Sequence, residues 1–217
     1  RFCLHNAYIN VDTRKMSKSA GDCFWVRDAA KKFGYGAIRY FLLASHYRNP
    51  VNFSEAILAQ SAAALERLQN CRENLAFRLE NAGNATDAPS LAAEAEQIMA
   101  RKADFLAAMD DDFNTANAIA VLFEITRDIN TLLKNESVSA DILRTLLGFY
   151  DELLGLFGFL PEEKTVDGDA EIEALVAERT KAKKEKDYQK ADELRARLKE
   201  MGVTLEDTPQ GTKWKKA

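Results

Sequence analysis

Apolar residues recur every three or four positions over most of the chain, which is the spacing of helices with one buried face. Ser54 precedes the longest such segment, and its hydroxyl can cap a helix that runs to about residue 80. Ser90 is the expected cap of a second helix, which ends near residue 109. Further apolar stripes occupy residues 119–133 and 142–157. Four helices with short connections predict an antiparallel bundle.

The first fifty residues follow another pattern. Residues 8–11 (Tyr-Ile-Asn-Val) predict a short strand. A helix is expected from residue 26 to residue 32, with Gly34 and Gly36 breaking it. A further helix over residues 38–45 carries an apolar face at helical spacing.

The last fifty residues predict a small separate domain. Residues 161–168 are acidic and contain glycine, as expected of a linker. Two short helices should follow over residues 169–186 and 188–201, the second capped by Asp187. Residues 203–205 and 212–214 then predict a hairpin.

These patterns predict a mainly α protein. Its parts are an N-terminal α/β stub that carries the Lys-Met-Ser-Lys-Ser segment, an antiparallel helix bundle, and a small α+β C-terminal domain with a short hairpin. The domains expected from the composition are residues 1–52, residues 53–160, a linker over residues 161–168, and residues 169–217.

The net charge of −4 is distributed unevenly. Residues 1–48 contain nine Lys and Arg against three Asp and Glu, and residues 179–217 contain twelve against seven. The intervening residues 49–178 contain nine against twenty-four. Two basic ends joined by an acidic middle suit a long polyanion that is held at separated points. Ordinary variation among helix surfaces is the alternative.

Cysteine usage and hydropathy narrow the class of protein. Cys3, Cys23 and Cys71 are widely spaced and form no CxxC pair, which favours neither a disulfide framework nor a metal site. A reducing cytoplasm is therefore the expected location. No apolar run approaches the roughly 20 residues that span a bilayer, so no membrane partner is expected. The chain has no initiator Met and opens like the middle of a domain, which predicts a fragment.

A basic pentapeptide lies near the N-terminus. Residues 15–19 read Lys-Met-Ser-Lys-Ser, and Gly21 follows closely. Two lysine ammonium groups and two serine hydroxyls can hold a polyphosphate while negative charge develops in a phosphoryl or nucleotidyl transfer. For any short basic segment, a solvated loop is the alternative.

The pentapeptide matches the second signature of class I aminoacyl-tRNA synthetases without a substitution. Its surroundings resemble one family of that class at residues 11–14, 26–28, 38–42, 46–48, 52–55 and 204–214. From its first residues to its last, the chain resembles the C-terminal half of a cysteinyl-tRNA synthetase. The pentapeptide indicates the class, and the tail indicates the amino acid.

The resemblance implies an enzyme that activates cysteine with ATP and Mg²⁺ and transfers it to tRNA(Cys), and we expect a monomer. Lys15 and Lys18 would be the catalytic residues, because they stabilise the departing pyrophosphate. The expected ATP-binding residues are Lys15, Met16, Ser17, Lys18 and Ser19. The family's zinc is held upstream, so no metal ligand is expected in this chain. The fold that binds adenine is missing, so the chain alone should be inactive. Asp22 stands where the family has Asn and should weaken catalysis.

The resemblance also implies tRNA contacts at both ends of the chain. Aromatic rings stack on unpaired bases, and carboxylates accept hydrogen bonds from base edges. The expected contacts are Arg39, Arg48, Lys183, Tyr188, Asp192, Arg195, Asp207 and Trp214, with Lys184, Lys186 and Lys190 adding positive charge. The C-terminal members would read the anticodon. For Arg39 and Arg48, a solvated helix surface is an equal alternative. For the tail, the alternative is a solvated helical hairpin with ion pairs between residues four positions apart and an aromatic core residue.

Three consecutive carboxylates, Asp110, Asp111 and Asp112, allow two interpretations. Oxygen ligands in a cluster can bind Mg²⁺. Acidic residues also favour a helix N-terminus, where the dipole is positive, and we favour this capping role.

Two rival functions use the same signature loop. One is a cysteine ligase that acts on a small amino-sugar acceptor, and residues 169–217 argue against it because such relatives lack an anticodon domain. The other is a non-catalytic paralogue that holds tRNA, and the intact signature argues against that.

Overall fold

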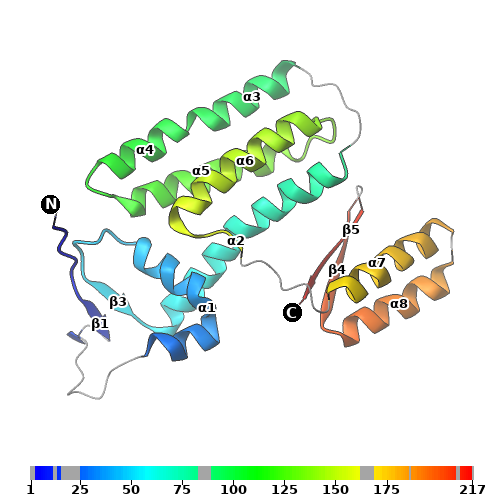
Figure 1. The fold of residues 1–217 in the computed structure, drawn as a ribbon, viewed down its shortest axis with the longest axis horizontal. Helices are drawn as coiled ribbons and strands as arrows, with labels where there is room; N and C mark the ends of the chain where they lie inside the picture. The colour runs from blue at the N-terminus through cyan, green and yellow to red at the C-terminus, as the bar shows by residue number, and fades with distance from the viewer. Residues whose placement is uncertain are drawn as a thin grey trace. The chain divides into compact units, whose positions relative to one another are not determined.

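The computed structural model describes residues 3–11, 14–15, 25–82, 89–161, 169–185, 187–208 and 211–216. The chain forms two compact units, Arg1–Pro161 and Glu162–Ala217 (Figure 1). Helices dominate both units, so the predicted mainly α class is confirmed. The finer division of the first unit at residue 52 stays a prediction.

A small sheet opens the first unit, in the order β2-β1-β3. The predicted strand is β1 (Ile9–Val11), which pairs antiparallel with β2 (Arg14–Lys15). It also pairs parallel with β3 (Val51–Phe53), a strand that the sequence pattern did not predict. The three residues of β3 are too few to show an alternation.

One kinked helix, α1 (Val26–Leu43), replaces the two helices expected here. Gly34 has a non-helical backbone with φ 81° and ψ 155°, so the break predicted there is confirmed. The break predicted at Gly36 is wrong, because this residue is helical. A Cβ at Gly36 would lie 2.8 Å from Leu65 Cδ2, so a larger residue here would make the Leu65 side chain of α2 (Glu55–Glu80) shift.

The predicted bundle consists of α2, α3 (Pro89–Ala100), α4 (Lys102–Asp110), α5 (Thr115–Leu132) and α6 (Ala140–Phe157) (Figure 1). Ser54 caps α2 as predicted, since its hydroxyl accepts from Ile57 N at 3.2 Å. Ser90 is not a cap, because α3 already begins at Pro89. The single helix expected to end near residue 109 is divided at Arg101 into α3 and α4.

The bundle core contains a small buried polar network. The Tyr150 hydroxyl lies 2.7 Å from Thr126 Oγ1 and donates to Leu68 O at 3.3 Å. The Cys71 thiol is buried beside Thr126 O, and burial raises its pKa to about 12. Burial also raises the pKa of Tyr150, so both groups are neutral at physiological pH.

The second unit packs α7 (Asp169–Lys184) on α8 (Tyr188–Glu200) and on a hairpin of β4 (Val203–Thr208) and β5 (Gly211–Lys216). Asp187 caps α8 as predicted, because its carboxylate accepts from Lys190 N at 3.1 Å. The predicted hairpin is confirmed and is longer than expected, with Leu205 opposite Trp214. The buried core of this unit consists of Ile172, Leu175, Val176, Leu194, Leu198 and Val203.

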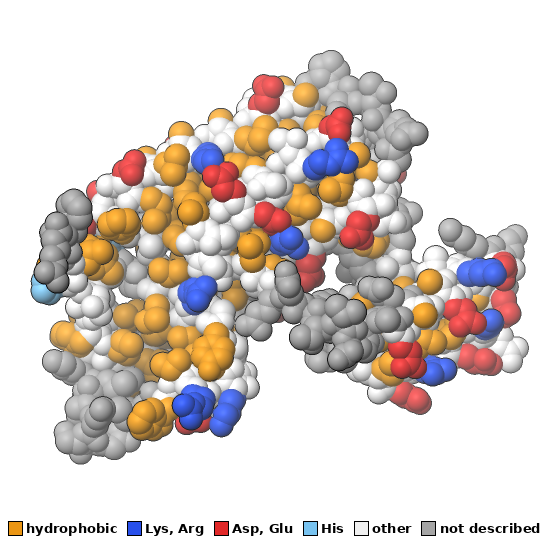
Figure 2. Space-filling model, in the orientation of Figure 1, with side chains coloured by type: hydrophobic (Ala, Val, Ile, Leu, Met, Phe, Trp, Pro, Cys, Tyr) orange, Lys and Arg blue, Asp and Glu red, His pale blue; other side chains and the backbone are white. Residues whose placement is uncertain are grey.

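Acidic and basic side chains are interspersed on the face of the bundle that Figure 2 shows. Among the described residues, no helix combines the length and the apolar character that a bilayer crossing requires.

Candidate nucleotide and nucleic-acid sites

The sheet positions the start of the signature loop. Lys15 ends β2, and its backbone lies opposite Asn10 of β1 in the antiparallel register. The side chain of Lys15 and the whole of Met16, Ser17, Lys18 and Ser19 lie outside the described residues. The predicted contacts of this loop with ATP therefore stay predictions.

The Arg39 side chain contacts the C-terminal end of α6. It lies on α1, and its Nη1 donates to the carbonyl oxygen of Gly158, the residue that ends α6, at 3.3 Å. The positive guanidinium therefore lies at the C-terminal, negative end of a helix dipole. The sequence pattern offered only a phosphate contact or a solvated surface for this arginine, and the structure adds a third role.

Arg48 is paired within the first unit. Its Nη2 lies 2.9 Å from Asp112 Oδ2, and its Nε donates to the Tyr47 hydroxyl at 3.0 Å. The Tyr47 hydroxyl in turn donates to Asp112 Oδ1 at 2.8 Å. The hydrogen bond to Tyr47 and the charge of Asp112 raise the pKa of Arg48 above its ordinary value. The Arg48 side chain is still 64% exposed, so a phosphate contact remains geometrically open.

The capping role expected for the acidic triplet is wrong for this helix. Asn114 caps α5 by accepting from Asn117 N at 3.1 Å. Asp110 instead ends α4, and Asp112 adopts a left-handed backbone with φ 56° that presents its carboxylate to Arg48. Within the described part of the chain, no group of three or more metal-ligating side chains comes together.

One side of α8 collects three of the predicted RNA contacts. Tyr188, Asp192 and Arg195 are exposed and follow one another at four and three positions, so they share one helix face. Tyr188 is 64% exposed, which leaves its ring accessible for stacking. The buried positions Ala191 and Leu194 lie on a neighbouring face and fix α8 to the core of its unit.

The other predicted contacts of the tail have less uniform surroundings. Lys183 is exposed on the last turn of α7. Trp214 is partly buried and packs against the core of the second unit, so the alternative of an aromatic core residue holds for part of its ring. The backbone of Asp207 pairs with Thr212, and its side chain lies outside the described residues.

Lys190 is engaged by an acidic neighbour. Its Nζ lies 2.8 Å from Glu178 Oε1, joining α8 to α7. This hydrogen bond raises the pKa of Lys190 and lowers the pKa of Glu178. A second exposed pair, Arg197 with Glu171 at 3.1 Å, also links these helices. These two ion pairs join the helices to each other, whereas the pairs expected of a solvated hairpin lie four positions apart within one helix.

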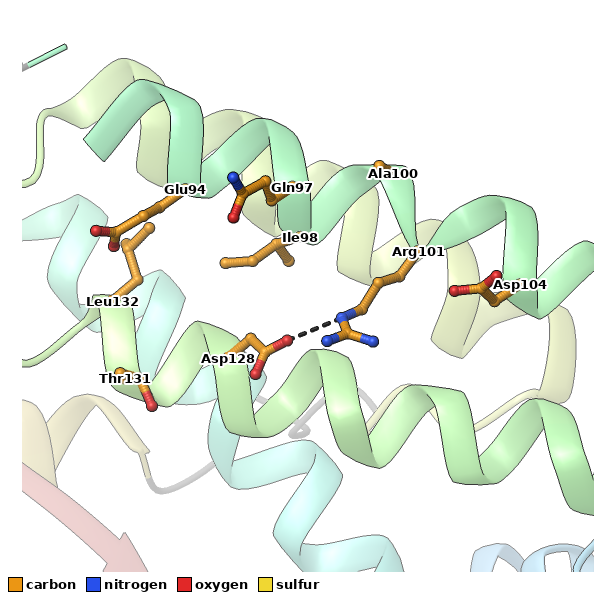
Figure 3. A pocket seen from close by; sticks show the side chains of 9 residues that line it. All are labelled: Glu94, Gln97, Ile98, Ala100, Arg101, Asp104, Asp128, Thr131 and Leu132. Atoms are coloured by element: carbon orange, nitrogen blue, oxygen red, sulfur yellow. Dashed lines mark hydrogen bonds and ion pairs between the residues drawn. The ribbon is translucent and has the colours of Figure 1, made fainter. Parts of the chain in front are cut away.

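A pocket of about 480 Å³ lies among α3, α4 and α5 (Figure 3). Arg101 is its one basic lining residue, and its guanidinium is held by Asp128 at 2.8 Å and by Glu124 at 2.7 Å. The further carboxylates of Glu94 and Asp104 give the lining an excess of negative charge, which disfavours ATP or an RNA phosphate here. The lining residues are Glu94, Gln97, Ile98, Ala100, Arg101, Asp104, Asp128, Thr131 and Leu132.

Comparisons with protein-family models define the class. The model of the tRNA synthetases class I (C) catalytic domain matches residues 1–63, and the DALR domain model matches residues 104–161. The anticodon binding domain of cysteinyl-tRNA ligase matches residues 165–214. From its catalytic to its anticodon-binding segment, the chain thus matches domains of a class I aminoacyl-tRNA synthetase.

Curated relatives define the family. The chain is 42% identical over 219 residues to a cysteine–tRNA ligase of Clostridioides difficile, and 40% identical over 218 residues to one of Bacillus pumilus. Each alignment covers 100% of this chain and 46% of the relative. The chain therefore belongs to the cysteine–tRNA ligase family, and it spans about half the length of these relatives.

A solved structure shares the fold. A LeuRS–tRNA–LeuAMS ternary complex from Agrobacterium radiobacter K84 matches with a TM-score of 0.58 and 23% sequence identity. The match covers 70% of this chain and 20% of that chain. At this level of identity the likeness concerns the arrangement of the backbone alone.

Sequence reasoning missed the residues that pair with Arg39 and Arg48. Asp112 was interpreted as part of a helix cap. Its pairing with Arg48 was missed because the two residues lie 64 positions apart in the sequence, which leaves no local signal. Gln69 donates to the carbonyl oxygen of Phe159 at 3.1 Å and was not singled out either. Gly158 directly follows the apolar stripe of residues 142–157, and a glycine in that place typically ends a helix, which is a signal that could have located this contact point.

Proposed function

We propose that this chain is the part of a cysteine–tRNA ligase that supplies the pyrophosphate-binding loop, the helix bundle and the anticodon reader. The complete enzyme would use ATP and Mg²⁺ to form cysteinyl-adenylate and would transfer cysteine to tRNA(Cys). The observation that carries the proposal is the exposed α8 face of Tyr188, Asp192 and Arg195, within a segment that matches an anticodon-binding domain.

Each charged or aromatic group has a distinct proposed role. Lys15 and Lys18 stabilise the negative charge that develops on pyrophosphate as it leaves. Tyr188 stacks on an unpaired base, Asp192 accepts from a base edge, and Arg195 forks onto a phosphate or a base acceptor. Lys183, Asp207 and Trp214 complete this surface in the proposal.

The zinc site of the family and the rest of the catalytic fold belong, in this proposal, to residues outside this chain. The enzyme would act as a monomer in the cytoplasm. The free thiols of Cys3 and Cys71 are compatible with a reducing compartment. Arg48 remains a candidate phosphate contact, because its side chain is mostly exposed.

The test is aminoacylation by the full-length enzyme. We expect cysteine to be attached to tRNA(Cys) and the rate to fall when the anticodon bases are changed. Asp192→Asn should weaken discrimination against altered anticodons by about ten-fold, because a bidentate base contact contributes about 1–3 kcal/mol. Glu193→Gln is the matched control, since Glu193 is exposed on another face of α8. Equal charging of all anticodon variants by the unmodified enzyme would refute the anticodon role.

Filter binding separates the rival functions. An amino-sugar ligase should bind tRNA(Cys) weakly and without regard to the anticodon. A non-catalytic tRNA-binding paralogue should bind it with anticodon selectivity but show no cysteine-dependent ATP–pyrophosphate exchange.

A further inference from the structure

The last turn of α6 is closed by a well-formed C-terminal motif. Gly158 adopts the left-handed conformation with φ 63° and ψ 39°. Its N–H donates to Gly155 O at 3.0 Å, and the N–H of Phe159 donates to Leu154 O at 2.9 Å. These two bonds are the pair that defines a Schellman motif. They satisfy carbonyl groups that would otherwise lack partners where the chain leaves the bundle.

Arg39 occupies the space beside this motif. Besides donating to Gly158 O, its Nη1 would lie only 1.8 Å from a Cβ built at position 158. Glycine is favoured there by the positive φ, and a larger residue would in addition displace the guanidinium from this place. One guanidinium N–H is directed inward, toward the end of a helix from a different part of the sequence.

A second pair of contacts holds the next residue. Gln69 of α2 donates to Phe159 O at 3.1 Å. The Phe159 ring is fully buried and lies 5.5 Å from the ring of Tyr40 and 5.4 Å from that of Phe157. Side chains from α1 and α2 thus fix the exit of the bundle, which we define as Gly158 and Phe159.

The position of this exit matters because the second unit begins shortly after it. The first unit ends at Pro161, and only the seven residues 162–168 separate it from the start of α7. If the exit unwound, the anticodon-binding unit would follow from a part of the chain that α1 and α2 no longer hold.

We propose that Arg39 is a positioning residue. Together with Gln69, it holds the bundle exit on α1 and α2, and so sets the point from which the anticodon-binding unit is tethered. This role differs from both interpretations of Arg39 that the sequence left open, a phosphate contact and a solvated helix surface. The inference rests on the proposed function, because it concerns how the anticodon reader reaches the same tRNA as the catalytic part.

The experiment compares two substrates of the full-length enzyme. One is the complete tRNA(Cys), and the other is a minihelix that contains only its acceptor stem and therefore has no anticodon. The variants are Arg39→Met, which removes the donor and the charge, and Gln69→Leu, which removes only a neutral donor. Arg144→Met is the matched control, because Arg144 lies at the opposite end of α6 and pairs only locally with Asp141 at 2.8 Å.

The expected result is a fall of at least about two-fold in kcat/KM for the complete tRNA with both Arg39→Met and Gln69→Leu, the usual size of the effect when a side chain that touches neither ligand couples two sites. Minihelix charging and cysteine-dependent ATP–pyrophosphate exchange should stay unchanged. The double variant should lose no more than the stronger single variant, because both side chains hold one element. Amide hydrogen exchange should accelerate at Gly158 and Phe159 in each variant.

Three outcomes would overturn the proposal. A phosphate contact would make Arg39→Met lower the rates of both substrates while Gln69→Leu has no effect. A purely stabilising cap would change exchange at Gly158 and leave every rate unchanged. If Arg39→Met unfolds globally, Gln69→Leu becomes the deciding variant. An unchanged kcat/KM of Gln69→Leu for the complete tRNA would then contradict the proposal. If the unmodified enzyme fails to charge tRNA(Cys), the proposed function itself is wrong.

Discussion

At the scale of single residues, two arginines of the first unit have specific protein partners. Arg39 contacts Gly158 O, and Arg48 forms an ion pair with Asp112. The family resemblance implied tRNA contacts for both arginines, with a solvated helix surface as an equal alternative. The sequence could not reveal their protein partners, because an arginine that binds phosphate and one that binds a carboxylate or a carbonyl look alike in a sequence. Their partners lie 119 and 64 positions away, beyond the range of any local pattern.

We predict that Gly158→Ala destabilises the first unit by at least about 1–2 kcal/mol, the cost of a left-handed backbone for a residue with a Cβ. The new methyl group must also displace the Arg39 guanidinium. Urea unfolding followed by circular dichroism measures the change. Gly148→Ala is the control, because Gly148 is helical with open space around it. This variant should be more stable than the unmodified protein by about 0.5–1 kcal/mol.

We also predict that the free energy of unfolding falls as the pH rises above about 9. Burial raises the pKa of Cys71 to about 12 from its ordinary value of 9.0, so the folded state stays neutral while the unfolded thiol ionises. The stability is complete below pH 9 and declines up to pH 12, by as much as about 1.4 kcal/mol per pH unit from this group. Cys71→Ala should show a shallower decline in urea titrations. Equal slopes for the two proteins would contradict the prediction.

At the scale of elements, patterns of burial and end signals were sufficient for most helices. Ser54 and Asp187 were identified as caps because the Ser54 hydroxyl and the Asp187 carboxylate each precede an apolar stripe. Both oxygens accept the predicted hydrogen bond. The prediction for Gly36 was wrong because residue type alone does not distinguish a glycine that breaks a helix from one that permits close helix packing. The strand β3 was missed because its pairing with β1 is long-range.

The cap of α8 gives a prediction for that element. Asp187→Ala should destabilise the second unit by about 1 kcal/mol, because the N–H of Lys190 loses its acceptor. Asp187→Asn keeps an oxygen acceptor and should be nearly neutral. Trp214 fluorescence during urea unfolding, in a Trp25→Phe background, reports on this unit, since Trp214 packs against its core. An equal loss for both variants would argue against the capping role.

At the scale of the whole molecule, the chain consists of two units with separate cores, and it spans 46% of the length of its relatives. The order of the parts and the family were predictable from the signature loop and the tail. The contacts of the loop with ATP and the base contacts of α8 stay predictions, because both depend on molecules that the chain binds rather than on its own packing.

For the chain by itself, we predict no cysteine-dependent ATP–pyrophosphate exchange, because in our proposal the groups that bind adenine and cysteine lie elsewhere in the full enzyme. Binding of tRNA(Cys) through the α8 face should persist in a filter assay. Exchange activity in this chain would show that cysteine can be activated without those groups.

The parallel pairing of β1 with β3 has a consequence for the order of assembly. It joins residues about forty positions apart, with the whole of α1 between them, whereas β4 and β5 are neighbours in a tight hairpin. Pairings between distant residues form slowly because a long loop must close first. During refolding from denaturant, we therefore expect the strands beside the Lys-Met-Ser-Lys-Ser segment to be among the last parts of the first unit to become protected.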